Sequence, residues 1–492
     1  IDFILATQPK EWGRLKEHYG DEARARFLHR LSSEIERRGT IEILRKGMKD
    51  AGIKFRLAFF KPSSKLNPDL QSLYLANQFT VIRQLAYSES TEQSLDLGLF
   101  LNGIPLFTAE LKNPLNGQKV EDAVKQYKRD RDPRERLFGY GRCLGHFAVD
   151  RNLVYVTTHL RGDDTLFLPF NQGRDRGAGN PHVPPTRHGY PTSYLWEETW
   201  TCDSVLDLVH QFIHEVELYD EDGRKTGKRF ILFPRYHQLD AVRRLVADAR
   251  VRGTGKNYLI QHSAGSGKSF TIAWLGHQLS TLHDAEDRRV FDSIIVITDR
   301  RVLDRQLQRT VLQFEQTLGV VENIDKTSRQ LRSALEDGKT IIVTTLQKFP
   351  VIVEEIGKLK GNRFAVIVDE AHSSQSGEST KSLKQVLAVA DLAEAEQEES
   401  SFESPDEELQ DRVLAELEIR GRLANLSMFA FTATPKSKTL ELFGEKLPKG
   451  KFGPFSLYSM RQAIEEGFIL DVLANYTTYK AYWKLLKTIA ED

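Results

Sequence analysis

Two carboxylates and a lysine stand on either side of a turn signal in the first third of the chain. Asp96 precedes the pair Asn102–Gly103, and Glu110 and Lys112 follow it. The flanking segments are apolar and strand-like, so they predict a β-hairpin. Glu110 and Lys112 are two residues apart and therefore share a face of their strand. Asp96, Glu110 and the main-chain oxygen of Leu111 would suit Mg²⁺, and Lys112 would activate a water that attacks a phosphodiester.

The turn decides whether Asp96 joins this group. A regular two-residue turn would place Asp96 opposite Ala109 and turn the two carboxylates apart, whereas a three-residue loop with a glycine bulge would place Asp96 opposite Glu110. We therefore predict an odd loop or a bulge in this hairpin. Pro105, which has no N–H to give to the ladder, agrees with an irregularity there. A regular turn without a bulge would rule out the metal site.

A phosphate-binding loop is predicted between residues 262 and 269. The sequence HSAGSGKS follows an apolar segment and precedes a helical pattern, so its backbone N–H groups would converge on a polyphosphate at a helix N-terminus. Lys268 would contact the β and γ phosphates, and the Ser269 hydroxyl would bind Mg²⁺. His262 stands where the strict GxxxxGK[ST] pattern has its first glycine. The expected nucleotide-binding residues of the loop are Gly265, Ser266, Gly267, Lys268 and Ser269.

An acidic pair follows a second apolar strand, residues 364–368. Asp369 would emerge at the carboxyl end of this strand and hold the hydration shell of Mg²⁺, and Glu370 would polarise the attacking water. The pair lies downstream of the phosphate loop, in the order that a nucleoside triphosphatase needs.

Length and composition bound the architecture. A chain of 492 residues predicts two or three cores, and 69 basic against 69 acidic residues exclude a protein that is basic over its whole surface. The two cysteines, Cys143 and Cys202, are too few for a disulfide framework or a four-cysteine zinc site, which favours a reducing, cytoplasmic setting. No apolar run is long enough to cross a bilayer, and the first residues do not resemble a secretory signal.

The pattern of elements predicts an α/β multidomain protein. Helical spacing over residues 23–53 gives way to strand-like segments at residues 79–87, 95–101, 104–111 and 153–158. A Gly/Pro-rich stretch, residues 171–193, is a linker or an ordered loop, and helical spacing returns at residues 205–216. From about residue 229 to 457 strands alternate with helices, which predicts a parallel sheet with right-handed crossovers. The acidic block at residues 385–411 is interpreted as a solvated insertion.

A basic segment follows the predicted hairpin. Its helix would bury Val120, Ala123, Val124 and Tyr127, and its basic residues would either follow a DNA backbone or form a solvated face. These residues are Lys125, Lys128, Arg129, Arg131, Arg134 and Arg136.

The second half resembles the first RecA-like domain of a superfamily 2 helicase or translocase, on the strength of the phosphate loop and the Asp-Glu-Ala-His sequence that ends at His372. The resemblance implies ATP and Mg²⁺ as cofactors and an adenine contact from Gln238, with Arg235 in the same motif. It implies coupling of hydrolysis to movement by the motif Thr432, Ala433 and Thr434. It also implies DNA-backbone contacts at Asp299, Arg300 and Thr345, although an Asp-Arg pair by itself is commonly an ordinary surface pair.

The first half is similar to PD-(D/E)xK nucleases, with Asp96, Glu110 and Lys112 as the motif residues. Gln126 resembles the glutamine of the RecB-like Q-x-x-x-Y motif, but the tyrosine stands next to it rather than four residues on. A nuclease ahead of a helicase-type motor resembles the restriction (R) subunit of type I restriction-modification enzymes. The resemblance implies ATP-driven translocation of double-stranded DNA and Mg²⁺-dependent cleavage away from the recognition site. It also implies methyltransferase and specificity subunits as partners, with S-adenosylmethionine used only by them.

The resulting domain expectations are a nuclease domain at residues 1–222 with its core at about 24–165, a RecA-like domain at 223–458, and a linker with the start of a second RecA-like domain at 459–492. Too few residues follow Phe468 for a second motor domain, so we expect an N-terminal fragment of a bacterial or archaeal cytoplasmic protein. Two alternatives stay open: a repair or remodelling translocase that processes DNA ends, and a nuclease-like domain that serves only for DNA binding and docking.

Overall fold

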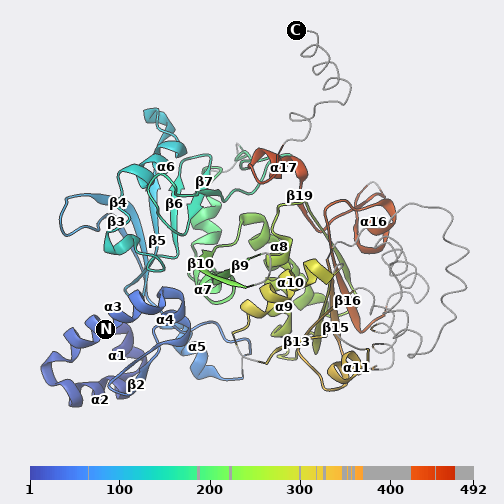
Figure 1. Ribbon diagram of the computed structural model, residues 1–492, viewed down its shortest axis with the longest axis horizontal. Helices are drawn as coiled ribbons and strands as arrows, with labels where there is room; N and C mark the ends of the chain where they lie inside the picture. Colours follow the sequence, from blue (N-terminus) through green and yellow to red (C-terminus); the bar gives the residue numbers. More distant parts are fainter. Residues whose placement is uncertain are drawn as a thin grey trace, which may run out of the picture.

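Two β-sheets organise the computed structural model of the chain, one in each half (Figure 1). The structure describes residues 1–64, 66–184, 189–220, 224–298, 301–316, 319–324, 328–345, 361–369, 423–448 and 450–470, with the single positions 352, 356 and 359; of residues 301–305 and 328–329 it describes the backbone alone. Predicted site residues Asp299, Arg300, Glu370 and His372 lie outside the described residues, as does the acidic block at 385–411.

The chain begins with a helical part. Its helices are α1 (Asp2–Thr7), α2 (Pro9–Tyr19), the short η1 (Gly20–Glu22), α3 (Ala23–Arg38) and α4 (Thr40–Lys46). The predicted helical spacing up to residue 53 is wrong beyond α4, because Gly47, with φ 72°, ends that helix and a hairpin of β1 (Met48–Asp50) and β2 (Ile53–Phe55) follows. Ala51 and Gly52 turn this hairpin at positive φ. Helix α5 (Pro68–Leu75) leads to the first sheet.

The first sheet has six strands in the order β3-β4-β5-β6-β7-β8. Its strands are β3 (Phe79–Ala86), β4 (Ser94–Leu101), β5 (Ile104–Leu111), β6 (Gly145–Val149), β7 (Val154–Thr157) and β8 (Leu168–Pro169). Only β5 and β6 are parallel, and α6 (Val120–Arg129) makes the crossover between them. Val120, Ala123 and Tyr127 of α6 are buried, as the sequence predicts, while β6 was not predicted. The sheet is the expected mixed α/β unit.

The β4–β5 hairpin contains the predicted irregularity as a bulge. Its turn has two residues, Asn102 and Gly103, both at positive φ, and the odd loop is therefore not formed. Leu101 pairs with Ile104, but the register shifts between Leu99 and Phe100, so that Leu97 pairs with Ala109. Continuing this register by one residue sets Asp96 opposite Glu110. The bulge is confirmed, and it is what turns the two carboxylates to one side.

A connecting segment joins the two sheets. It contains the π-helical turns η4 (Leu195–Thr199) and η5 (Leu208–Phe212), helix α7 (Cys202–Asp207) and the antiparallel pair β9 (His214–Tyr219) and β10 (Lys225–Leu232). The helical spacing predicted through residue 216 is wrong after η5, because the backbone becomes extended at Ile213 and enters β9. The Trp274 indole donates to the Phe212 carbonyl at 2.8 Å and ties this segment to the second sheet.

The second sheet confirms the predicted parallel arrangement. Its seven strands run in the order β13-β14-β12-β15-β16-β11-β19, and the neighbouring strands pair in parallel. The strands are β11 (Asn257–His262), β12 (Ser293–Thr298), β13 (Val321–Asn323), β14 (Ile341–Thr345), β15 (Phe364–Val368), β16 (Leu426–Thr432) and β19 (Ser456–Tyr458). Five of these strands, β11, β12, β14, β15 and β16, read as buried apolar runs, which is why the sequence predicted them, whereas the short β13 and β19 were not predicted.

Helices accompany this second sheet (Figure 1). They are α8 (Tyr236–Arg252), α9 (Lys268–Ser280), α10 (Arg301–Gln313), α11 (Ser328–Glu336), α16 (Ser437–Phe443) and α17 (Met460–Glu465), with a small β17 (Glu445–Lys446) and β18 (Phe452–Gly453) pair. One apolar cluster continues from the N-terminal helices through both sheets. Within the described residues, no helix combines the length and the apolar character that a membrane span requires.

Burial keeps several histidines neutral, and this predicts acid sensitivity. Burial lowers the pKa of His146 and His262 to about 3 and that of His210 to about 4. In the unfolded chain these imidazoles take up protons near pH 6.5, so the unfolded state binds more protons and stability falls as the pH drops from 6.5 towards 4. We expect the His146→Gln variant to flatten this slope in urea unfolding measured across that range. The same substitution at the exposed His18 is the control, and an equal effect of both changes would contradict the prediction.

Candidate functional site

The first candidate site lies where β3, β4 and β5 meet. Asp96 accepts a hydrogen bond from the Leu111 main-chain N–H at 2.7 Å through Oδ2 and one from the Gln84 side-chain amide at 3.2 Å through Oδ1. A cavity of about 590 Å³ opens beside these residues. Its lining consists of Arg83, Gln84, Asp96, Leu97 and Leu111.

Glu110, the second carboxylate, is 1% exposed and pairs with Arg131, which is 5% exposed. The Nε and Nη2 atoms of Arg131 donate to the same oxygen, Glu110 Oε1, at 2.9 and 2.5 Å. Burial favours the neutral form of Glu110 and Arg131 favours the charged form; burial is the larger effect and raises the pKa of Glu110 to about 7. Arg131 also donates to the Ser94 carbonyl and to the Tyr87 hydroxyl, so the guanidinium is firmly held.

Lys112 lies in contact with the helix that follows the hairpin. Its Nζ donates to Gln126 Oε1 at 2.5 Å. The lysine of the nuclease motif therefore contacts the glutamine that was compared with the Q-x-x-x-Y motif. The neighbouring Tyr127 is buried, and its hydroxyl lies 2.8 Å from the hydroxyl of Thr108, a residue of β5. Gln126 thus has a structural partner in the site, and its part in catalysis stays a prediction.

Three residues near the carboxylates escaped the sequence reasoning. Gln84 has φ 51°, which is uncommon for a residue with a side chain, and such strain gathers at functional sites. Arg83 and Gln84 come from β3, whose sequence carries no signal of chemistry. Arg131 was noted only as one member of a basic run, because its partner Glu110 is distant in sequence.

The donor chemistry of this site fits Mg²⁺ in part. Asp96, Glu110 and the Leu111 carbonyl offer oxygen, the ligand type that Mg²⁺ prefers. Within the described ranges, no group of three or more His, Cys, Asp or Glu residues is placed to hold a metal ion. Water and substrate phosphate would have to complete the shell, and Arg131 would have to give up Glu110 Oε1. The residues therefore suit a weakly held, substrate-dependent ion.

The second candidate site lies between β11 and α9. Gly265 and Gly267 have φ 70° and 76°, the left-handed conformations that turn backbone N–H groups towards one point. A Cβ atom on Gly267 would come within 2.7 Å of the Gln238 side-chain nitrogen, so a larger residue there would displace the Gln238 amide. The Ser266 hydroxyl is buried without a hydrogen-bond partner among the described residues. An open nest of this kind suits phosphate oxygens.

Gln238 and Arg235 donate side-chain hydrogen bonds to carbonyl groups of the phosphate loop. Gln238 is buried and donates to the carbonyls of Ser266 and Gly267 at 3.2 and 3.0 Å, and Arg235 donates to the Gly265 carbonyl at 2.8 Å. Gln238 Oε1 accepts from the Arg235 main-chain N–H at 2.9 Å. The predicted adenine contact of Gln238 therefore stays a prediction, while its support of the loop is observed.

His262 explains how the loop tolerates the missing first glycine. It is the last residue of β11 and continues the strand register opposite Tyr458. The position does not have positive φ, so no glycine is needed there. Its Nε2 contacts the Ser456 hydroxyl at 3.0 Å within the core.

The remaining motif residues reach the same edge of the sheet. Strand β16 pairs with both β11 and β15, so Thr432 at its end lies between the strand that leads into the loop and the strand that ends before Asp369. The Thr432 hydroxyl accepts from the Thr434 N–H at 3.2 Å, and Ala433 lies between them. Thr345 ends β14 at this edge. Because all these strands are parallel, their carboxyl ends bring Asp369, Thr345 and Thr432 to one edge of the sheet.

The segment after α17 covers the loop. A Cβ atom on Gly265 would come within 3.2 Å of the Ile469 side chain and the Phe468 carbonyl, and the Arg235 guanidinium lies 3.6 Å from the Phe468 ring centre. Glu465 of α17 accepts from the Ala178 N–H at 2.7 Å, which joins the Gly/Pro-rich loop of the N-terminal half to this segment. The two halves of the chain therefore meet beside the phosphate loop.

Comparison with known proteins assigns each half separately. Residues 9–165 match the family described as type I restriction enzyme R protein N terminus, and residues 237–394 match the SWI2/SNF2 ATPase family. The endonuclease subunit of the type I restriction enzyme SauCOLORF180P from Staphylococcus aureus is 23% identical over 85% of this chain and 38% of the relative. The HindI endonuclease subunit from Haemophilus influenzae is 26% identical over 81% of this chain and 34% of the relative. The chain thus spans little more than a third of these relatives' length.

Among solved structures, a fragment of a type I restriction enzyme HsdR subunit from Vibrio vulnificus matches 79% of this chain and 56% of its own, at 15% identity and a TM-score of 0.28. The sequence matches define an α/β chain with a nuclease-type N-terminal unit and a helicase-type ATPase unit. The chain is similar to HsdR-type chains, the endonuclease subunits of type I restriction enzymes.

The Arg131–Glu110 pair predicts a measurable competition with metal. We expect the Arg131→Gln variant to lose about 3–5 kcal/mol of stability without metal, because a buried carboxylate is left unpaired. Mg²⁺ should restore part of this stability, since it can replace the lost positive charge. Thermal unfolding with and without Mg²⁺ measures both effects.

The control for this experiment is Arg134→Gln, in the same loop, because Arg134 pairs with Asp132 and both side chains are largely exposed. It should change neither the stability nor the response to Mg²⁺ by much. If Mg²⁺ stabilises the Arg131→Gln protein no more than the unaltered protein, the carboxylates do not form a metal site.

Proposed function

We propose that the protein is the motor and nuclease subunit of a type I restriction enzyme. It would move double-stranded DNA at the expense of ATP and cut it, with Mg²⁺, away from the recognition site. The observation that carries the proposal is the bulge in the β4–β5 hairpin, which sets Asp96 and Glu110 on one side, with Asp96 lining a cavity. This arrangement occurs in the same chain as a phosphate loop at the carboxyl edge of a parallel sheet.

In the nuclease site, we assign Asp96, Glu110 and the Leu111 carbonyl as ligands of Mg²⁺, which would supply charge stabilisation at the scissile phosphate. Lys112 would orient the attacking water, and its contact with Gln126 would position the ammonium group. The PD-(D/E)xK assignment rests on these positions.

In the motor site, Gly265, Ser266, Gly267 and Lys268 would bind the phosphates of ATP. Ser269 and Asp369 would hold the Mg²⁺ ion, and Glu370 would polarise the water. Thr432, Ala433 and Thr434 would couple hydrolysis to movement together with His372, and Asp299, Arg300 and Thr345 would contact the DNA backbone. Arg235 and Gln238 would support the adenine side of the site.

The division of the chain also belongs to the proposal. Residues 1–222 would form the nuclease domain, 223–458 the first RecA-like domain, and 459–492 a linker with the start of a second one. Methyltransferase and specificity subunits would supply site recognition, with S-adenosylmethionine bound by them alone, in the cytoplasm of a bacterium or archaeon.

One observation favours a second function. Arg131 donates two hydrogen bonds to the oxygen of Glu110 that a metal would need, so a nuclease-like domain used only for DNA binding and docking would look the same. An end-processing translocase is a further alternative and would degrade DNA ends without partner subunits.

Two substitutions in the full-length protein, assembled with its partner subunits, separate the activities. Asp96→Asn should lower DNA cleavage at least about a hundredfold and leave ATP hydrolysis unchanged, because a metal ligand is lost. Lys268→Ala should abolish ATP hydrolysis and translocation but leave DNA association largely intact, because the phosphates lose their cation. Cleavage of plasmid DNA and release of phosphate are the measurements.

The exposed Asp163, which pairs with Arg129 at the surface, provides the control variant Asp163→Asn, and it should behave like the unaltered protein. Normal cleavage by the Asp96→Asn protein would overturn the nuclease assignment and support the docking function. Normal translocation by the Lys268→Ala protein would overturn the phosphate-loop assignment.

A further inference from the structure

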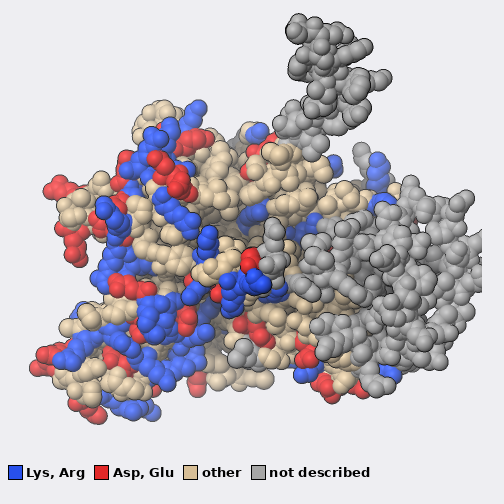
Figure 2. Space-filling view, viewed as in Figure 1, with Lys and Arg blue, Asp and Glu red and all other residues tan. Residues whose placement is uncertain are grey.

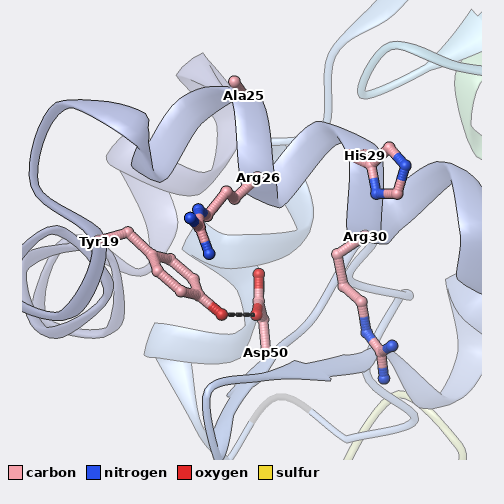
Figure 3. Close-up of a pocket in the computed structure, with 6 residues that line it drawn as sticks. All are labelled: Tyr19, Ala25, Arg26, His29, Arg30 and Asp50. Atoms are coloured by element: carbon pink, nitrogen blue, oxygen red, sulfur yellow. Dashed lines mark hydrogen bonds between the residues drawn. The ribbon is translucent and has the colours of Figure 1, made fainter.

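A pocket of about 400 Å³ lies in the N-terminal helical part, apart from both sites described above (Figure 3). It is formed by the end of α2, the first half of α3 and the end of β1. Its lining consists of Tyr19, Ala25, Arg26, His29, Arg30 and Asp50. No role in cleavage or ATP hydrolysis has been assigned to any of these residues.

The wall of the pocket contains an unsatisfied acceptor. Asp50 is 6% exposed, and its Oδ1 accepts a hydrogen bond from the Tyr19 hydroxyl at 3.0 Å. Its Oδ2 is buried and has no hydrogen-bond partner among the described residues. This hydrogen bond raises the pKa of Tyr19, so the hydroxyl stays a donor to Oδ1 and cannot serve Oδ2. A buried polar atom without a partner is unfavourable, and because Oδ2 is closed off from solvent in this structure, a bound donor reaches it only when a neighbouring side chain moves aside.

The rim of the pocket carries basic side chains that donate hydrogen bonds, in contrast to the acceptor in its wall. Arg26 and Arg30 are one helical turn apart on α3 and therefore share a face with the pocket (Figure 3). Arg26 Nε donates to Glu22 Oε2 at 2.7 Å, and Arg30 Nη2 forms an ion pair with Glu34 Oε1 at 3.0 Å. Their other guanidinium N–H groups have no hydrogen-bond partner within the part of the chain that is described. Two arginines with spare donors suit an anion, and a guanidinium plane also stacks on a base.

The surroundings favour a nucleic acid as the source of that anion. Residues 1–60 contain 13 Lys or Arg against 9 Asp or Glu, although the whole chain is neutral. Figure 2 shows basic side chains gathered over the N-terminal helices, with acidic ones among them. A local positive surface of this kind attracts a phosphate backbone.

We propose that this pocket binds an unpaired nucleotide of a DNA strand, with the exocyclic amine of the base donating to Asp50 Oδ2 and the phosphate bound by Arg26 and Arg30. Cytosine fits this pattern because its N4 amine is a donor, whereas thymine presents an acceptor, O4, at the same place. The pocket is a DNA contact beyond the nuclease and motor sites, and the choice of DNA rests on the function proposed above.

The test compares hairpin DNA that carries a single-stranded tail of either cytosine or thymine, with binding to the full-length protein measured by fluorescence anisotropy. We expect the cytosine tail to bind about tenfold more tightly than the thymine tail, the effect of one hydrogen bond to a charged group. Asp50→Asn places an amide donor where Oδ2 was and keeps the acceptor for Tyr19. It should remove or reverse the preference, which a merely structural role of Asp50 would not do.

The arginines give a second measurement on the same DNA. Arg26→Gln and Arg30→Gln should each weaken binding of both tails several-fold and reduce its salt dependence. Arg24→Gln is the matched control, because Arg24 is exposed on the same helix and does not line the pocket. Its substitution removes the same positive charge. Equal effects of the Arg24 and Arg26 changes would overturn the site.

The remaining outcomes separate this inference from the proposed function. If the hairpins bind but neither the tail base nor Asp50→Asn matters, the pocket assignment is overturned and the proposed function stands. If free dCMP binds as tightly as the cytosine tail, the site takes a free nucleotide rather than a strand, which overturns the proposal as stated. If no DNA binds in any form, the proposed function fails as well.

Discussion

The ladder between β4 and β5 is the constraint on which the first half of the molecule depends. Side chains alternate across a strand, so a shift of one residue moves every following side chain to the other face. The bulge between Leu99 and Phe100 makes that shift once, just after a regular two-residue turn. The contact of Asp96 with the Leu111 N–H and its position across from Glu110 follow from it, while its contact with Gln84 depends on the pairing of β3 with β4.

In the motor half, the parallel pairing of the second sheet positions the site residues. Because its strands all run in one direction, the phosphate loop, Asp369 and the motif at Thr432 leave the sheet at one edge. The loop is then held by hydrogen bonds from Gln238, and Phe468 and Ile469 lie near Gly265. The contact between Ala178 and Glu465 gives the nuclease half a direct connection with that second group.

Burial gives the carboxylates of the molecule their different characters. Glu110 and Asp50 are both buried, but Glu110 is paired with Arg131, whereas one oxygen of Asp50 has no partner among the described residues. A paired carboxylate resists a new ligand, and an unpaired one favours a donor. This contrast is why the nuclease site is expected to depend on metal and substrate together, and why the N-terminal pocket is open to a ligand.

Much of the fold could be predicted from the sequence because it depends on patterns within short segments. The apolar runs of β11, β12, β14, β15 and β16, the glycines of the phosphate loop and the need for a bulge near Pro105 are all properties of short segments. The predictions failed where a segment changed its structure midway. The helical spacing around Met48 and Val216 misled because Gly47 and the extended backbone at Ile213 end the helices early, and β6 was missed although Gly141 precedes it and Asp150 and Asn152 follow it.

The sequence by itself therefore determined which residues could do chemistry and which family they resemble, since motif spacing and apolar periodicity are local. Only the tertiary structure decided that Arg131 occupies Glu110, that Gln84 contacts Asp96, that Gln238 supports the loop, and that Tyr19 satisfies just one oxygen of Asp50. Each of these is a contact between residues far apart along the chain or on different elements. Such contacts depend on how strands are paired and helices packed, and no short segment carries that information.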